Sequence, residues 1–314
     1  MVYFVSFASN FLTAKNAKES QGAPKGKRAI CGTICSRLQY RIHSPMTELL
    51  QIFIIAVAQG IGEFLPISSS GHNAVINHLF EWFGNPLTED SAEFIKLNIL
   101  LHVGSLVAVL IVFRQRIIEM LGKERRLIFL LMIASVPTAA VGYPIYKYAP
   151  WIQDHLPLIS VCFLLTGIML LYTLRLPEGE KTTSTMTWKD ALIIGCVQAF
   201  AILPGISRSG ATIVAALCCR LKREEAAAFS FILSIPVIAG SGLLEFIDMI
   251  KDSPEGAAQT LPDWLLLIGA AVSCIAGILA LLFLLDWLKK GKLWYFALWV
   301  FFMSPMAMLL AFLK

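Results

Sequence analysis

The chain has 314 residues, of which 57% are apolar and only 15% are charged. An ordinary soluble domain carries about 25% charged residues, so the composition excludes a disordered chain, a disulfide-stapled secreted module and a strongly charged nucleic-acid binder. The seven cysteines form no Cys-x-x-Cys pair and are expected to be small buried side chains. A mean hydropathy of +0.71 is typical of an integral membrane protein.

The net charge of +5 comes from the N-terminal extension, since residues 1–45 hold seven Lys or Arg and one acidic residue. These basic residues follow the first apolar run, whereas a secretory signal peptide places them before it. We interpret residues 1–45 as a basic, disordered extension or as sequence upstream of a start at Met46, with a targeting segment as the alternative. The body, residues 46–314, is expected to insert and act without it.

Two apolar stretches of the body, 47–83 and 190–222, are interrupted by polar sequence that contains Gly and Pro. Each arm is shorter than the roughly 20 residues that a membrane-spanning helix needs. Broken helices are tolerated in lipid only where protein encloses the broken backbone, so each stretch is predicted to be a re-entrant helical hairpin. Six other segments are predicted to span the membrane: 95–113, 127–149, 157–175, 226–246, 264–287 and 293–313.

The two interrupted stretches resemble each other, and Ser68 of the first recurs 139 positions later as Ser207. Each hairpin is followed by three spans, so the chain divides into halves at about 47–175 and 190–313. An odd number of spans inverts the second half relative to the first. The prediction is an all-α polytopic membrane protein with six transmembrane helices and two re-entrant hairpins in an inverted repeat. Such folds place their site near the midplane, where the broken helices meet.

The distribution of positive charge predicts the orientation of the body. The loops 114–126, 175–190, 220–225 and 288–292 hold 14 Lys or Arg, whereas the loops on the opposite side hold four. An excess of Lys and Arg marks the cytoplasmic side of a membrane protein. These four loops are therefore predicted to be cytoplasmic, with the ends of the first hairpin on the opposite side.

The second hairpin contains the charged side chain of Arg208, and charges within a membrane usually mark function. Glycine exposes backbone N–H groups, hydroxyls donate hydrogen bonds, and a planar guanidinium can grip phosphate with two of its N–H groups. A packing turn with a snorkelling arginine is the structural alternative. The sequence Ser-Arg-Ser within a mid-membrane break favours an anion clamp made of Gly205, Ser207, Arg208, Ser209 and Thr212.

The first hairpin contains Glu63 and His72 among hydroxyl side chains. Ser69 and His72 are three residues apart, so a helical turn would place them on one face, where histidine can transfer a proton or activate the serine. Gln59 and Glu63 are four residues apart and can hold a divalent cation or orient the histidine. Each spacing alone also fits a satisfied structural group, but their combination, mirrored by an arginine in the second hairpin, predicts a hydrolytic site.

These motifs resemble the paired signatures of the undecaprenyl-diphosphatases, the bacterial bacitracin-resistance family. The signatures are (Glu/Gln)-x-x-x-Glu followed by Phe-Leu-Pro-x-Ser-Ser-x-Gly-His, and Pro-Gly-x-Ser-Arg-Ser-x-x-Thr, and the match extends over about 47–314. The resemblance implies hydrolysis of a polyprenyl diphosphate lipid, which yields the monophosphate carrier of peptidoglycan synthesis. It also implies the bacterial inner membrane as location, Mg²⁺ or Ca²⁺ as cofactor, no nucleic-acid partner, and a homodimer as one candidate assembly.

The resemblance also assigns roles by position. Gln59 is the amide option where many members have Glu, which puts a two-carboxylate metal site in question. Ser69 and His72 both stay candidates for the nucleophile. The catalytic residues are predicted to be Glu63, Ser69, His72 and Arg208; the diphosphate ligands Ser68, Ser70, Gly205, Ser207, Ser209 and Thr212; and the metal ligands Gln59 and Glu63.

Two other functional classes fit part of the pattern. A transporter or polyprenyl-phosphate flippase would also use an inverted repeat with broken helices, but it needs no Ser, His and Glu beside an arginine clamp. A type-2 phosphatidic acid phosphatase would share Ser70-Gly71-His72, but that class needs a further histidine motif downstream, and no histidine follows His155. Release of phosphate from a lipid diphosphate distinguishes an enzyme from a carrier.

Overall fold

The computed structural model describes residues 45–84, 92–252 and 262–313. The chain divides into two compact units, Met1–Leu50 and Gln51–Lys314. The predicted extension, residues 1–45, lies outside the described residues except for Pro45, and of the first unit only the beginning of one helix is described. The second unit contains every predicted site residue.

The described residues are helical almost throughout, and the only β-pairing among them is an isolated bridge between Lys181 and Leu221. The α-helices are α3 (Pro45–Phe64), α4 (Ser69–Trp82), α5 (Ala92–Val112), α6 (Arg114–Gly122), α7 (Arg125–Tyr148), α8 (Leu156–Tyr172), α9 (Trp188–Phe200), α10 (Arg208–Cys218), α11 (Arg223–Asp252), α12 (Asp263–Lys289) and α13 (Tyr295–Phe312). Two 3₁₀ turns, Pro150–Asp154 and Thr173–Arg175, flank α8.

Six helices of the described residues are long and apolar enough to cross a membrane, namely α5, α7, α8, α11, α12 and α13. They coincide with the six predicted spans and confirm the prediction of an all-α, multi-pass membrane protein. The helix α11 exceeds its predicted span at both ends, since it has 30 residues. At 1.5 Å per residue it measures about 45 Å, longer than a hydrocarbon core of about 30 Å.

Both interrupted stretches form helical hairpins, α3–α4 and α9–α10, and each packs closely on a helix of the opposite half. A Cβ added to Gly60 of α3 would lie 2.3 Å from the carbonyl oxygen of Ser273 in α12, and one added to Gly195 of α9 would lie 2.3 Å from that of Ala134 in α7. Only glycine permits such contacts, which are typical of helix packing in membranes. The two pairings are equivalent in an inverted repeat, whereas re-entry of the hairpins into a bilayer stays a prediction.

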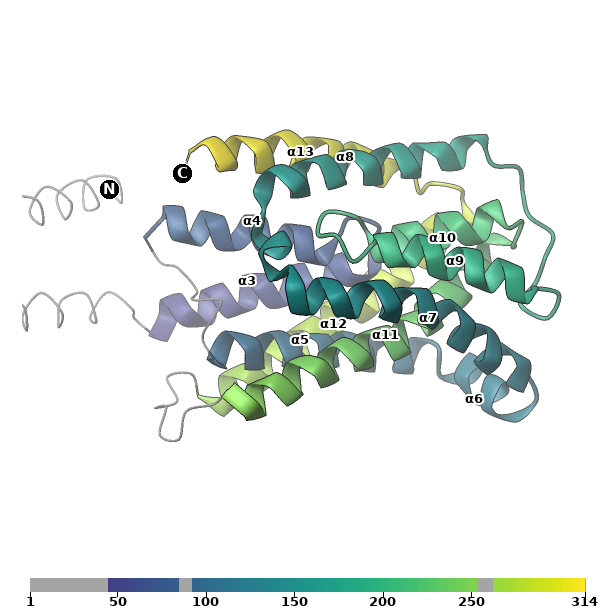
Figure 1. Ribbon diagram of the computed structural model, residues 1–314, viewed down its shortest axis with the longest axis horizontal. Coiled ribbons are helices and arrows are strands. Elements are labelled where there is room, and N and C mark those ends of the chain that lie inside the picture. The colour runs from purple at the N-terminus through teal and green to yellow at the C-terminus, as the bar shows by residue number, and fades with distance from the viewer. Residues whose placement is uncertain (1–44, 85–91, 253–261, 314) are drawn as a thin grey trace, which may run out of the picture. The chain divides into compact units, whose positions relative to one another are not determined.

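The last spans of the two halves, α8 and α13, lie side by side (Figure 1). Ser160 Oγ donates to the carbonyl oxygen of Ser304, and Ser304 Oγ donates to that of Ser160, both at 2.8 Å. In α5 and α12, the hydroxyls of Ser105 and Ser273 lie 3.1 Å apart. Buried hydroxyls therefore satisfy one another between apolar helices, and the reciprocal serine pair relates equivalent helices of the two halves.

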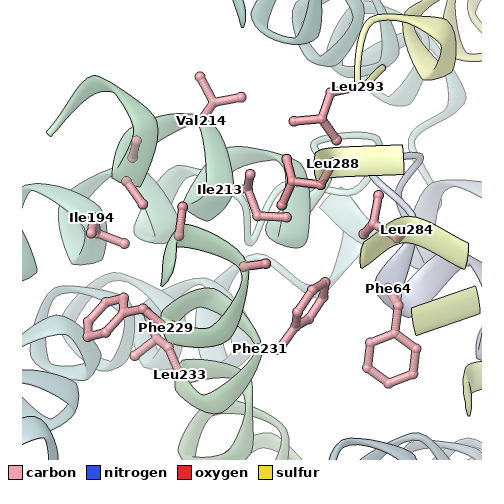
Figure 2. Packing of buried hydrophobic residues seen from close by; sticks show 14 of the residues in the cluster. Phe64, Ile194, Ile213, Val214, Phe229, Phe231, Leu233, Leu284, Leu288 and Leu293 are labelled. Carbon is pink, nitrogen blue, oxygen red and sulfur yellow. The ribbon is translucent and has the colours of Figure 1, made fainter. Parts of the chain in front are cut away.

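A buried apolar cluster joins the end of α3 to side chains of α9, α10, α11 and α12 (Figure 2). The ring of Phe64 packs edge-on against that of Phe231 in α11, with centroids 5.9 Å apart. Lipid is as apolar as these side chains, so their stabilising effect comes from close packing rather than from exclusion of water. Phe64 is fully buried, and it thereby fixes the position of the neighbouring Glu63.

Candidate active site

The tips of the two hairpins are in direct contact. The N–H of Gly205 donates to Ser68 Oγ at 3.0 Å, and a Cβ added to Gly71 would lie 2.9 Å from Gly205 Cα. Gly205 has a φ of +93°, which glycine adopts without strain, and its carbonyl oxygen accepts a hydrogen bond from Thr166 of α8 at 2.8 Å. The broken segments of the two halves thus meet, as the sequence predicts.

Ser68 links the two tips through its side chain. Its φ of +71° lies in a region that residues other than glycine rarely adopt. Its Oγ accepts hydrogen bonds from the N–H groups of Gly71, at 3.3 Å, and of Gly205, at 3.0 Å. A strained backbone conformation persists only where many surrounding contacts hold it, and such places are often functional sites. The hydroxyl of Ser68 is therefore committed to holding the tips together.

The carboxylate of Glu63 accepts hydrogen bonds from both hairpins. Ser69 Oγ donates to Oε2 at 2.8 Å, and Gln59 Nε2 donates to the same oxygen at 3.1 Å. Arg208, which lies 145 residues further along the chain, forms an ion pair with Oε1 through its Nη2. The side chains of Glu63 and Arg208 are only 8% and 14% exposed. A pair so buried is stable only because each charge faces the other and further donors satisfy the carboxylate.

The second amino group of Arg208, Nη1, is buried, and no residue in the described part of the chain accepts a hydrogen bond from it. Arg208 borders a cavity of about 730 Å³, together with Glu63, Ser69 and Ser70. A buried donor without a partner is unfavourable by roughly 1–3 kcal/mol, or more when it is charged. An anionic group that enters the cavity would remove this penalty, and guanidinium matches phosphate oxygens well.

Two helices begin at the wall of this cavity, α4 at Ser69 and α10 at Arg208. The first N–H groups of a helix lack partners within the helix, and the helix dipole makes this end partly positive. Helix N-termini therefore bind anions such as phosphate. The two N-termini and the arginine make this part of the cavity suited to a phosphorylated ligand.

The cavity continues between α5, α7 and α11 and reaches Gln153, beyond the end of α7 that the charge distribution places outside the cytoplasm. Its wall is largely apolar, but it also contains a polar cluster. Asn98 Nδ2 donates to Glu245 at 3.2 Å, and the His102 ring bonds through Nδ1 to the carbonyl oxygen of Asn98 at 2.9 Å. These residues are not among the predicted site residues, although an acid and a histidine inside predicted spans are a recognisable signal.

The predicted site residues separate into two groups. One group lines the cavity: Gln59, Glu63, Ser69, Ser70 and Arg208. The other group lies at the hairpin tips away from the cavity wall: Ser68, His72, Gly205, Ser207, Ser209 and Thr212. Ser207 Oγ caps α10, Ser209 Oγ donates to a backbone carbonyl of the first hairpin, and Thr212 Oγ1 donates to the carbonyl of Arg208 at 2.9 Å. In this arrangement their side chains shape the turn that presents Arg208.

His72 does not reach the cavity wall. Its Nδ1 lies 2.8 Å from the carbonyl oxygen of Ser68. A carbonyl only accepts, so Nδ1 carries the proton and Nε2 is left to accept the hydrogen bond from Trp299 Nε1, also at 2.8 Å. The expected pairing of Ser69 with His72 is therefore absent, because both nitrogens of the ring are engaged elsewhere and the Ser69 hydroxyl faces Glu63.

The polar residues around Glu63 do not fit a divalent cation held by Gln59 and Glu63. Gln59 Oε1 accepts a hydrogen bond from Asn73 Nδ2 at 2.9 Å, and Gln59 Nε2 faces Glu63. The carboxylate itself accepts from three donors. Across the described ranges, no group of three or more His, Cys, Asp or Glu is arranged to hold a metal ion.

The chain matches the family model described as "Bacitracin resistance protein BacA" over residues 52–306. It belongs to this family. The BacA match begins within α3 and includes the rest of the first hairpin, the whole second hairpin and every residue that lines the cavity.

Curated relatives of this BacA chain carry one name. An "Undecaprenyl-diphosphatase" of Rhodopirellula baltica is 40% identical over 254 residues, which are 81% of this chain and 95% of the relative. An "Undecaprenyl-diphosphatase 3" of Bacillus cereus is 36% identical over 264 residues, covering 84% and 97% of the two chains. An "Undecaprenyl-diphosphatase" of Thermodesulfovibrio yellowstonii is 35% identical over 269 residues, covering 86% and 100%.

Proposed function

We propose that this protein hydrolyses undecaprenyl diphosphate to undecaprenyl phosphate and inorganic phosphate. This reaction recycles the lipid carrier of peptidoglycan synthesis and confers resistance to bacitracin. Membership in the BacA family and the name shared by the relatives support the proposal. The structural observation that carries it is Arg208, which lines the cavity, binds Glu63 with one amino group of its guanidinium and has the other buried and unpaired.

The proposed binding mode follows from the polarity of the cavity. The terminal phosphate lies between the N-termini of α4 and α10 and accepts a hydrogen bond from Arg208 Nη1. The first isoprene units lie along the apolar wall formed by α5, α7 and α11. The remaining prenyl chain, which is apolar, extends into the bilayer.

In the first proposed step, Ser69 Oγ attacks the terminal phosphorus. The hydroxyl proton passes to Glu63 Oε2, which already accepts it as a hydrogen bond at 2.8 Å. A bond forms between Oγ and phosphorus while the bridging oxygen–phosphorus bond breaks, and undecaprenyl phosphate leaves with the electron pair. Arg208 stabilises the charge that spreads over the transferring phosphoryl group.

In the second step, water attacks the phosphoserine at phosphorus. Glu63, which has returned its first proton to solvent, takes a proton from this water, and Ser69 Oγ leaves and regains a proton. Inorganic phosphate then diffuses out of the cavity. His72 acts through the Ser68 backbone, since its ring holds the carbonyl oxygen of the residue before Ser69.

The decisive experiment is release of inorganic phosphate by the purified protein from undecaprenyl diphosphate in detergent. A protein that binds the lipid but releases no phosphate would refute the proposal and favour a carrier. Mass spectrometry after rapid acid quench then locates the covalent intermediate. Phosphate on Ser69 supports the proposed nucleophile, phosphate on His72 replaces it, and turnover without any phosphoenzyme indicates direct attack by water with Glu63 as base.

Location, assembly and cofactor complete the proposal. The bacterial inner membrane is the proposed location, supported by the six apolar helices and by bacterial relatives. All residues that the mechanism uses come from one chain, so the homodimer implied by the resemblance is tested separately, by light scattering in detergent. A cation, Mg²⁺ or Ca²⁺, stays a proposal from the resemblance, and no step above passes through it.

A further inference from the structure

Two hydrogen bonds connect the facing sides of α3 and α4 like the rungs of a ladder. Ser69 on α4 donates to Glu63 on α3. Asn73, one turn after Ser69, donates at 2.9 Å to Gln59, one turn before Glu63. The two rungs are joined along α3 by the bond from Gln59 Nε2 to Glu63. Residues four apart on a helix lie on one face, which explains why both pairs meet.

The direction of every hydrogen bond in this ladder is determined by Glu63. An ionised carboxylate only accepts, so Gln59 must present its NH₂ group to Glu63. Its carbonyl oxygen then faces Asn73, which must present its own NH₂ group in turn. Gln59 is only 1% exposed, and Asn73 is the donor that its amide oxygen has. The orientation of the Gln59 amide therefore depends on Asn73.

The remaining oxygen of Asn73 shows that this side chain belongs to the site. Asn73 Oδ1 is buried, and no residue in the described ranges donates to it. Asn73 also lines the cavity that Glu63 and Arg208 border. An asparagine serving only to pack two helices would have both ends of its amide satisfied, since an unpaired buried acceptor is unfavourable.

We propose that Asn73 is a positioning residue for catalysis, which acts by fixing the amide of Gln59 so that it donates to the carboxylate of Glu63. With two donors on Oε2 and Arg208 on Oε1, the carboxylate cannot rotate, and its alignment with the Ser69 hydroxyl is maintained. This inference rests on the proposed function, and it assigns a task to Gln59 that differs from binding a cation.

The first test replaces Asn73 by an isosteric side chain that cannot donate. In Asn73→Asp, the Gln59 amide must turn its NH₂ group toward the new carboxylate, and its oxygen then faces Glu63. We expect kcat for phosphate release to fall about 10–100-fold, the effect typical of supporting hydrogen-bond partners. KM should stay within about threefold, because the proposed binding mode places the diphosphate at Arg208 and the helix N-termini rather than at Asn73. The matched amide-to-acid control is Gln115→Glu on the exposed face of α6, which should retain full activity.

The second test is a double-mutant cycle with Gln59→Leu and Asn73→Leu. If Asn73 acts through Gln59, the double variant loses no more kcat than Gln59→Leu alone, within about twofold. Losses that multiply would overturn the inference, as would an Asn73→Asp variant with wild-type kcat. Unfolding temperatures in detergent are measured for all variants. If Asn73→Asp does not fold, the double-mutant cycle with the leucine variants alone tests the inference. A wild-type protein that releases no phosphate overturns the proposed function as well, whereas an active one with multiplicative losses overturns this inference alone.

Discussion

The replacement of Arg208 by lysine tests the central feature of the site. The guanidinium binds Glu63 through Nη2 while Nη1 remains buried at the cavity. It can therefore hold the carboxylate and a phosphate oxygen at the same time. Lysine carries one compact ammonium group on a flexible stem, and it cannot reproduce the planar two-sided contact. Arg208→Lys keeps the positive charge and removes one of the two contacts.

The expected loss follows from the number of charged hydrogen bonds removed. A hydrogen bond to a charged group contributes about 1.5–3 kcal/mol, and 1.36 kcal/mol corresponds to a tenfold change in rate, which gives roughly 10–150-fold. In a preorganised site that excludes water, loss of one such donor typically lowers kcat by about 10²–10³. We therefore expect Arg208→Lys to reduce kcat at least about a hundredfold.

The assay measures phosphate released from C55 diphosphate by protein in detergent, at saturating and at limiting substrate. Arg125→Lys is the matched control, because Arg125 lies on the exposed surface at the start of α7, away from the cavity. It should behave as the wild type. Near-normal turnover of Arg208→Lys would contradict the two-sided contact and reopen the interpretation as a carrier.

Three further variants test the surroundings of the site and the fold. Glu63→Gln removes the proton acceptor of the serine hydroxyl, so kcat should fall at least about a hundredfold at all pH values and added Mg²⁺ or Ca²⁺ should not restore it; recovery with either cation would refute this role. Gln59→Glu places two carboxylates together in a poorly screened site, so phosphate release should become dependent on divalent cations, and full activity in EDTA would contradict this. Burial raises the pKa of Asp190, but hydrogen bonds from Thr187 and the ammonium of Lys181 together lower it by more. The pKa therefore lies below its ordinary value of 3.8. Its stabilising contribution is therefore complete above that value and is lost as the pH falls through the lower, folded pKa. Asp190→Ala should destabilise the protein by about 1 kcal/mol at pH 7, because it removes the capping-box partner of Thr187 at the start of α9. A difference in unfolding temperature that does not shrink below about pH 4 would contradict the assignment.

Much of the architecture could be predicted from the sequence, because apolar runs and a repeated motif are easily recognised and together determine how distant segments are arranged. Six apolar runs could only be spans, and the recurrence of Ser68 as Ser207 indicated that the two breaks are equivalent. Equivalence in an inverted repeat brings both breaks together. The pairing of Glu63 with Arg208 was not predicted, because the sequence analysis assigned the carboxylate to a cation or to the histidine and the guanidinium to phosphate; the structure places the two charges together.

The roles of individual side chains were harder to predict, because they depend on rotation about helix axes that sequence spacing does not determine. Ser69 and His72 are close on α4, yet one faces Glu63 and the other Trp299 on α13. No local sequence pattern predicts that a tryptophan of the last span donates a hydrogen bond to His72. Asn73, in contrast, could have been found, because it follows Ser69 by four residues and faces the helix that carries Gln59.

The long separation between the members of the buried ion pair has a consequence for biosynthesis. Glu63 and Arg208 are 145 residues apart, and at 5–20 residues per second the ribosome needs about 7–30 s to make the intervening chain. During this interval the first hairpin exists without its arginine, and an isolated carboxylate in hydrocarbon is strongly unfavourable. If the hairpin re-enters the bilayer as predicted, it must hold Glu63 as a neutral acid until Arg208 is made, or wait at the membrane surface. Synthesis that stops before α10 is expected to leave a hairpin that cannot settle in the bilayer and is exposed to quality-control proteases.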